Sequence, residues 1–164
     1  MGQKEIEKEI IDLLYKNEIT MGKLYGEFAR QFPMYRPFWE GIVTEEESHA
    51  AWIETLYRKT EGGLVEFAEK RFPIEAIRQN VENMEAVLEE AKKGEMTAAE
   101  ALEKAVHFEH GMLENKFFEV FEGDSAELQL ILEALRLGTQ EHFRRVEEVW
   151  KKETMNAETE NKLR

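Results

Sequence analysis

The chain has 164 residues, of which 42% are hydrophobic and 35% are charged, and its formal net charge is −13 at pH 7. This length is typical of one domain with one core, and the composition excludes collagen-like, low-complexity and wholly disordered proteins. The acidic charge disfavours nucleic acid as a partner, and the absence of cysteine excludes disulfides, thiolate catalysis and iron–sulfur clusters. Carboxylate and imidazole groups are therefore the metal ligands that the chain offers.

The same composition favours a soluble helical protein. Asp occurs only at positions 12 and 124, so nearly all of the 35 acidic residues are Glu, a strong helix former. No segment approaches the roughly 20 apolar residues that a membrane helix needs, and the N-terminal residues lack the pattern of a secretion signal. We therefore expect an all-α protein that is located in the cytoplasm and has no membrane partner.

Four long stretches have apolar residues at intervals of three and four, which is the pattern of amphipathic helices. They cover residues 3–31, 37–60, 97–122 and 125–153. Phe32-Pro33 ends the first stretch, and the consecutive glycines Gly62-Gly63 end the second.

The third and fourth stretches begin with capping signals. Thr97 with Glu100, and Asp124 with Glu127, have the spacing of a capping box, so these two helices are predicted to begin there. Beyond the fourth stretch the apolar period is lost, so residues 154–164 are expected to be a disordered tail.

A long crossover joins the second stretch to the third. It contains a shorter amphipathic run, which Pro73 opens and Gly94 closes, and we expect a fifth, short helix there. Short connections link the first stretch to the second and the third to the fourth, so each pair is predicted to be antiparallel. The predicted fold is an all-α four-helix bundle in one domain, residues 1–153, with the crossover and its extra helix between helices 2 and 3.

Polar residues lie within the apolar face of every long helix when successive residues are placed about 100° apart. These inward positions are Glu18 in the first helix, Glu46 and His49 in the second, Glu109 in the third and His142 in the fourth. Isolated buried charges are costly unless they share a partner. A bound metal ion supplies such a partner, and carboxylates and imidazoles that converge from facing helices suit two iron or manganese ions.

The step Glu46-x-x-His49 by itself has little weight, because a chain so rich in Glu produces such a match by chance. The inward polar residue in every long helix is what favours a metal site, and the alternative is a buried polar network without metal. His107, His110 and Glu114 flank the inward face of the third helix or are exposed, and they could form an extra surface metal site. Thr139 lies one turn before the inward histidine of the fourth helix.

Four segments carry a family pattern: NEITMGKLYGEFA, FWEGIVTEEESHAAWIETL, ALEKAVHFEHGMLENKFF and TQEHFRRVEEVW. Through them the chain, over roughly residues 5–152, resembles the rubrerythrin-like branch of the ferritin-like superfamily. The second segment, with its Glu-x-x-His step, is the most specific. The resemblance implies a ferritin-like bundle with a di-iron site, whose metal ligands would be Glu18, Glu46, His49, Glu109 and His142.

Two features depart from this family. Its fourth helix usually carries a second Glu-x-x-His step, but here Thr139 stands where the Glu would be. With two divalent ions and three carboxylates, hydroxide, peroxide or another anion would balance the remaining charge, and binding of a single metal ion is an alternative. The cysteine-ligated rubredoxin domain of many rubrerythrins is also absent from these residues, so we expect a separate electron-donor protein.

One functional hypothesis and one alternative follow. In the first, Glu46 and Glu109 bridge two iron ions while Glu18, His49 and His142 are terminal ligands, and the protein oxidises ferrous iron or reduces peroxide or dioxygen. Manganese or zinc could occupy the same ligands. The alternative is a non-catalytic ferritin-like protein for metal binding, storage or sensing, or a metal-free helical interaction protein. The aromatic residues of the later helices are compatible with a homodimer.

Overall fold

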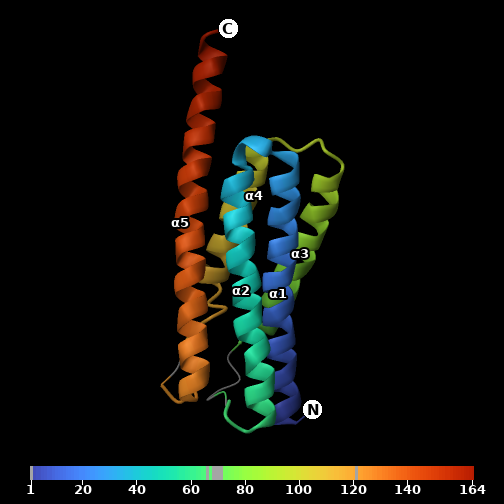
Figure 1. Ribbon diagram of the computed structural model, residues 1–164, viewed down its shortest axis with the longest axis vertical. Coiled ribbons are helices and arrows are strands. Elements are labelled where there is room, and N and C mark those ends of the chain that lie inside the picture. The colour runs from blue at the N-terminus through green and yellow to red at the C-terminus, as the bar shows by residue number, and fades with distance from the viewer. Residues whose placement is uncertain (1, 66, 68–71, 121) are drawn as a thin grey trace.

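The structure is a computed structural model and describes residues 2–65, 67, 72–120 and 122–164. No strand occurs among these residues, which confirms the predicted all-α class (Figure 1). The elements are α1 (Gln3–Gln31), the short 3₁₀ helix η1 (Pro33–Tyr35), α2 (Arg36–Glu61), α3 (Ile74–Lys92), α4 (Ala98–Glu114) and α5 (Ala126–Lys162). None of these helices is long and apolar enough to cross a membrane.

The link between α1 and α2 is short because proline restarts the helix where α1 ends. Phe32 N–H donates to the Phe28 carbonyl at 2.9 Å and closes α1. Pro33 opens η1, and Pro37 lies in the first turn of α2, where its missing N–H breaks no helical hydrogen bond. As a result α1 and α2 pack against each other along their lengths (Figure 1).

A glycine pair ends α2, and α3 occupies the predicted crossover. Gly63 has a φ of 72°, a left-handed value that glycine adopts without strain, and Leu64 N–H donates to the Lys59 carbonyl at 2.8 Å. The helix α3, which lies in the crossover, confirms the predicted fifth helix. It runs beside α1 (Figure 1), and its buried residues recur at helical intervals: Ile77, Val81, Met84, Val87 and Ala91.

The helix α4 begins where the sequence predicts but ends well before residue 122. At its start Glu100 N–H donates to Thr97 Oγ1 at 3.2 Å and Thr97 N–H donates to Glu100 Oε2 at 2.8 Å, so the predicted capping box is confirmed. After α4, Phe117 and Phe118 are both buried. The helix ends where Lys116 takes a left-handed φ of 55° and Phe117 N–H donates back to the Met112 carbonyl at 3.1 Å.

The helix α5 differs from the prediction at both ends. Its N-cap residue is Ser125, in place of the expected capping box of Asp124 and Glu127. At its other end it continues through residues 154–162, where the sequence predicts a disordered tail, and stands beyond the other helices (Figure 1). This segment contains neither Gly nor Pro and consists mainly of residues compatible with helix, so helical hydrogen bonds persist without a buried face.

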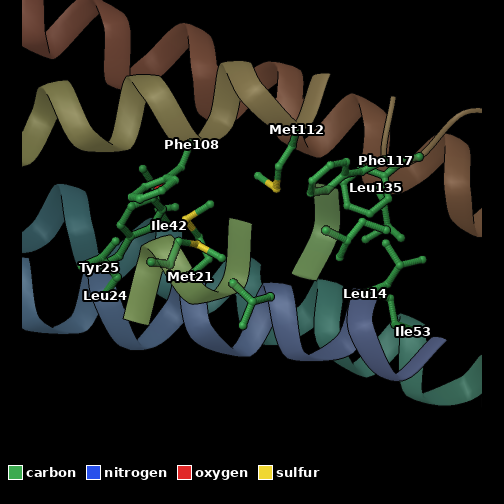
Figure 2. Packing of buried hydrophobic residues seen from close by; sticks show 14 of the residues in the cluster. Leu14, Met21, Leu24, Tyr25, Ile42, Ile53, Phe108, Met112, Phe117 and Leu135 are labelled. Atoms are coloured by element: carbon green, nitrogen blue, oxygen red, sulfur yellow. The ribbon is translucent and has the colours of Figure 1, made fainter. Parts of the chain in front are cut away.

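Apolar side chains pack on both sides of the middle of the helices. Figure 2 shows one group that includes Tyr25, Ile42 and Phe108, and a second group that includes Leu14, Ile53 and Leu135. Because α1 and α2 contribute to both groups, inward residues that fall between these positions lie between two apolar layers. Glu18 of α1 and Glu46 of α2 are in this interval, so the fold itself places charged groups where water has little access.

Candidate metal centre

The five polar residues predicted to face the core lie together between the helices. Each is almost completely buried, with exposed fractions of 1% for Glu18, 2% for Glu46, 4% for His49, 0% for Glu109 and 1% for His142. The helical repeat explains the arrangement, since each residue lies on the apolar face of its own helix: α1, α2, α4 and α5 all contribute. The structure thus brings all five together, as the sequence pattern requires.

Glu46 lies between the two histidines, with one carboxylate oxygen toward each. Its Oε2 is 3.3 Å from His49 Nδ1, and its Oε1 is 3.0 Å from His142 Nδ1. Glu18 Oε2 is 3.2 Å from His49 Nδ1, and Glu109 Oε1 is 3.6 Å from His142 Nδ1. The cluster therefore has two halves that share Glu46. We call Glu18, Glu46 and His49 the first half-site, and Glu46, Glu109 and His142 the second half-site.

Several polar atoms of this cluster are unsatisfied within the described part of the chain. Glu46 Oε1, Glu109 Oε2 and His142 Nδ1 are buried and make no hydrogen bond, although Glu46 Oε1 lies at ion-pair distance, 3.0 Å, from His142 Nδ1. Such atoms are rare in protein interiors, and each calls for an explanation. Glu46, His49 and His142 each offer one ligand atom within 4.8 Å of the others, so this group could bind a metal ion.

The electrostatics of the cluster favour a cation. Burial and the nearby charge of Glu46 raise the pKa of Glu18 from 4.5 to about 7. Burial acts to lower the pKa of His49, but hydrogen bonds with Glu18 and Glu46 outweigh it and raise this pKa from 6.5 to about 9. Burial likewise opposes protonation of His142, yet the carboxylates of Glu109 and Glu46 raise its pKa to about 11. In the metal-free protein, the protons on Glu18, His49 and His142 occupy the positions that a bound metal ion would take.

Tyr25 holds one of the carboxylates. Its hydroxyl donates to Glu109 Oε1 at 2.8 Å, which leaves Glu109 Oε2 as the unsatisfied oxygen. Burial and the charge of Glu109 raise the pKa of Tyr25 well above its usual value, so the phenol keeps its proton and remains a donor. Tyr25 thereby fixes the orientation of the Glu109 carboxylate.

Glu45 is a residue of the site that sequence reasoning missed, because the run of three glutamates at 45–47 reads as helix surface with only Glu46 inward. Glu45 Oε2 instead accepts from His142 Nε2 at 2.8 Å, and Arg145 Nη1 donates to both Glu45 oxygens at 2.8 and 2.9 Å. Partial burial acts to raise the pKa of Glu45, but Arg145 and His142 hold it below its usual value. With Nε2 committed to Glu45, His142 presents Nδ1 to the second half-site. The one available signal was Arg145, one turn after His142.

Gly138 supplies space for His49. A Cβ atom on Gly138 would lie 2.5 Å from His49 Nε2 and 2.6 Å from Cε1, so the imidazole occupies the place of a side chain. The two histidine rings stack with their centroids 5.2 Å apart. A glycine within α5 thus permits the close approach of α2 at this level.

The remaining candidate residues lie differently. His110 Nδ1 is 3.6 Å from Glu114 Oε2, but the two side chains are 53% and 71% exposed, and within the described residues no third ligand joins them. Thr139 is buried one turn before His142, on the face of α5 that carries the site. Among the described residues neither His107 nor any other ligand completes a group of three with His110 and Glu114, so the extra surface site has two ligands at most there.

Comparison with known proteins adds no relative. No protein-family model, curated protein or solved structure matches the chain. Function is therefore inferred from the residues of the site and their geometry.

Proposed function

We propose that this protein binds two metal ions, with iron as the principal metal, in a ferritin-like bundle of the rubrerythrin-like type. The observation that carries the proposal is the position of Glu46, whose two oxygens face two different histidines at 3.3 and 3.0 Å. Each half-site combines two carboxylates with one imidazole, a donor set that iron and manganese both accept. The positions of Glu46 Oε1, Glu109 Oε2 and His142 Nδ1 fit this role, because a cation that displaces the His142 proton would bind all three atoms.

The proposed ligands divide between the half-sites. Glu18 and His49 would hold one ion and Glu109 and His142 the other, with Glu46 between them. Three carboxylates leave part of the charge of two divalent ions unbalanced, and Thr139 adds no charge, so a small anion would complete the site.

The proposed activity is oxidation of ferrous iron coupled to reduction of peroxide or dioxygen. When bound, two ferrous ions would each give one electron, and these electrons with two protons would convert one peroxide molecule into two water molecules. The chain contributes a buried pocket of fixed ligands: the apolar layers exclude water, and Tyr25 and Glu45 orient Glu109 and His142. A separate protein would return the electrons.

One observation favours a second candidate, a protein that binds metal for storage or sensing without turnover. Thr139 is 1% exposed and lies one turn before His142 in α5, where a glutamate would supply a further carboxylate to the second half-site. A weaker second ion would leave single occupancy, and two-electron reduction of peroxide needs two ferrous ions.

The experiment that separates these candidates is an anaerobic titration of metal-stripped protein with ferrous iron, followed by one addition of peroxide. The proposed function predicts two ions per chain and rapid oxidation, recorded by absorbance in the near ultraviolet. One ion per chain, or two without oxidation, would establish the binding or sensing role. No specific binding would mean that the cluster is a structural network.

A pair of histidine variants controls this titration. His49→Ala should abolish oxidation, because the first half-site loses its only imidazole. His107→Ala removes an exposed histidine of α4 and should leave stoichiometry and oxidation unchanged. Equal loss in both variants would show that iron is oxidised elsewhere on the surface.

A further inference from the structure

Asn17 is a fully buried amide beside Glu18, and its side chain joins three helices. Its Nδ2 donates to Glu18 Oε1 at 3.0 Å and lies 3.0 Å from Met112 Sδ of α4. Its Oδ1 accepts from Asn80 Nδ2 of α3 at 2.8 Å. The exposed fraction of Asn17 is 0%, so no water competes for these bonds. Every polar atom of this side chain therefore has a protein partner.

The orientation of this amide matters because its two ends differ in chemistry. The N–H₂ end attracts a carboxylate, whereas the carbonyl end repels one. Packing alone distinguishes the two orientations poorly, since the amide is nearly symmetric in shape. Donation from Asn80 Nδ2 to Asn17 Oδ1 is complementary to the orientation in which Asn17 Nδ2 faces Glu18.

The two carboxylate oxygens of Glu18 therefore have different partners. Asn17 holds Oε1, while Oε2 lies 3.2 Å from His49 Nδ1 on the inner side of the cluster. The carboxylate is thus fixed before any ion binds, with Oε2 toward the first half-site. A charge-assisted hydrogen bond of this kind is among the stronger ones in proteins.

We propose that Asn17 is a positioning residue for Glu18 and that Asn80, on the crossover helix α3, sets its orientation. The proposal rests on the proposed function in one respect, since it takes Glu18 as a metal ligand. It makes α3 part of the metal site, although this helix supplies no ligand.

The test compares four variants of the full chain with the wild type. Asn17→Leu removes the donor while keeping a side chain of similar size. Asn80→Ala removes the donor to Asn17, and Asn80→Asp replaces it with a group that, when ionised, only accepts. Asn83→Ala is the matched control, since Asn83 is exposed one turn further along α3 and its Oδ1 accepts from Gln79 Nε2. The probe is Co²⁺ added to metal-stripped protein, because its visible absorption reports both affinity and coordination.

The expected results follow from the chemistry of the amide. Asn17→Leu should lower the Co²⁺ affinity of the first half-site by about 10-fold to 100-fold and change its spectrum. Asn80→Asp should weaken binding more than Asn80→Ala, because the new carboxylate draws Asn17 Nδ2 away and turns Oδ1 toward Glu18. A role in packing alone predicts the opposite order, since alanine removes more volume. Asn83→Ala should bind as the wild type does.

Different failures have different meanings. Unchanged affinity and spectrum in Asn17→Leu would overturn the positioning role while leaving the proposed function intact, as would an Asn80→Ala variant that binds more weakly than Asn80→Asp. A wild type that binds no Co²⁺ would overturn both proposals together. Thermal unfolding of each metal-free variant checks folding, and if Asn17→Leu does not fold, the order of the two Asn80 variants decides.

Discussion

At the scale of single residues, Gly138 is the position where the site depends on the absence of a side chain. Gly138→Ala should displace the His49 ring and disturb its contacts with Glu18 and Glu46, because the new Cβ would lie 2.5 Å from Nε2. We expect a loss of about 1–3 kcal/mol in the free energy of unfolding of the metal-free protein, as in other overpacked interiors, and weaker metal binding. Urea unfolding and Co²⁺ titration measure the two effects.

Gly26 is the matched control for this substitution. It also lies within a long helix, α1, but a Cβ there would meet nothing within 4 Å. Gly26→Ala should leave metal binding unchanged and raise stability by up to about 1 kcal/mol through helix propensity. If both alanine variants behaved alike, the steric explanation for Gly138 would be wrong.

Glu45 offers a second test at this scale. Glu45→Gln removes the charge that pairs with Arg145 and leaves only a neutral amide oxygen to accept from His142 Nε2, so the bond that directs Nδ1 inward is weakened. We expect about tenfold weaker binding of the ion in the second half-site, measured by calorimetric titration. Glu47→Gln, at an exposed position on the same helix, should bind as the wild type does. Equal affinity in the two variants would count against the role of Glu45.

At the scale of helices, local signals predicted most of the elements. The periods of α1 and α2, the Phe32-Pro33 break and the Gly62-Gly63 stop are visible in sequence because each acts within a few residues. The end of α4 was not predictable in this way, since the left-handed turn falls on Lys116, and a lysine carries no signal for this conformation. The extension of α5 was missed because an apolar period indicates a buried face, and residues 154–162 have none. Residues of adequate helix propensity can continue an existing helix without packing against another element.

The same difference between local signals and contacts across helices applies to the residues of the candidate site. The five inward residues were predictable because a ligand must lie on the buried face of its own helix, and periodicity locates that face. Glu45, Asn17 and Gly138 were not, because each acts across a helix–helix contact whose rotation and register no local pattern specifies. The proposed ligands were therefore visible in sequence, and the residues proposed to orient them were visible only in three dimensions.

At the scale of the whole molecule, the buried cluster links stability to pH. In the metal-free folded protein the pKa of Glu18 is raised from 4.5 to about 7, and that of His49 from 6.5 to about 9. The folded state therefore binds more protons than the unfolded chain in this range, and its free energy of unfolding falls as pH rises. His142, with a pKa of about 11, extends the same trend to higher pH.

This linkage predicts that rising pH lowers the stability of the metal-free protein and increases the stabilisation that a metal ion adds. Metal-free protein should be less stable at pH 9 than at pH 6.5 in urea unfolding. A metal ion binds the deprotonated ligands, so the stabilisation that a saturating ion adds should be larger at pH 9 than at pH 6.5. Metal-free stability that is constant or rises over this interval would contradict the raised pKa values.

The shared position of Glu46 also has a consequence for the order of assembly. Glu18, Glu46 and His49 all belong to the first 49 residues, so the first half-site is complete as soon as α1 and α2 have folded together. Glu109 and His142 arrive later along the chain, and an ion held by them and Glu46 would tie α4 and α5 to α2. In the proposed site the first ion therefore stabilises the packing of α1 against α2, whereas the second ion links α4 and α5 to α2.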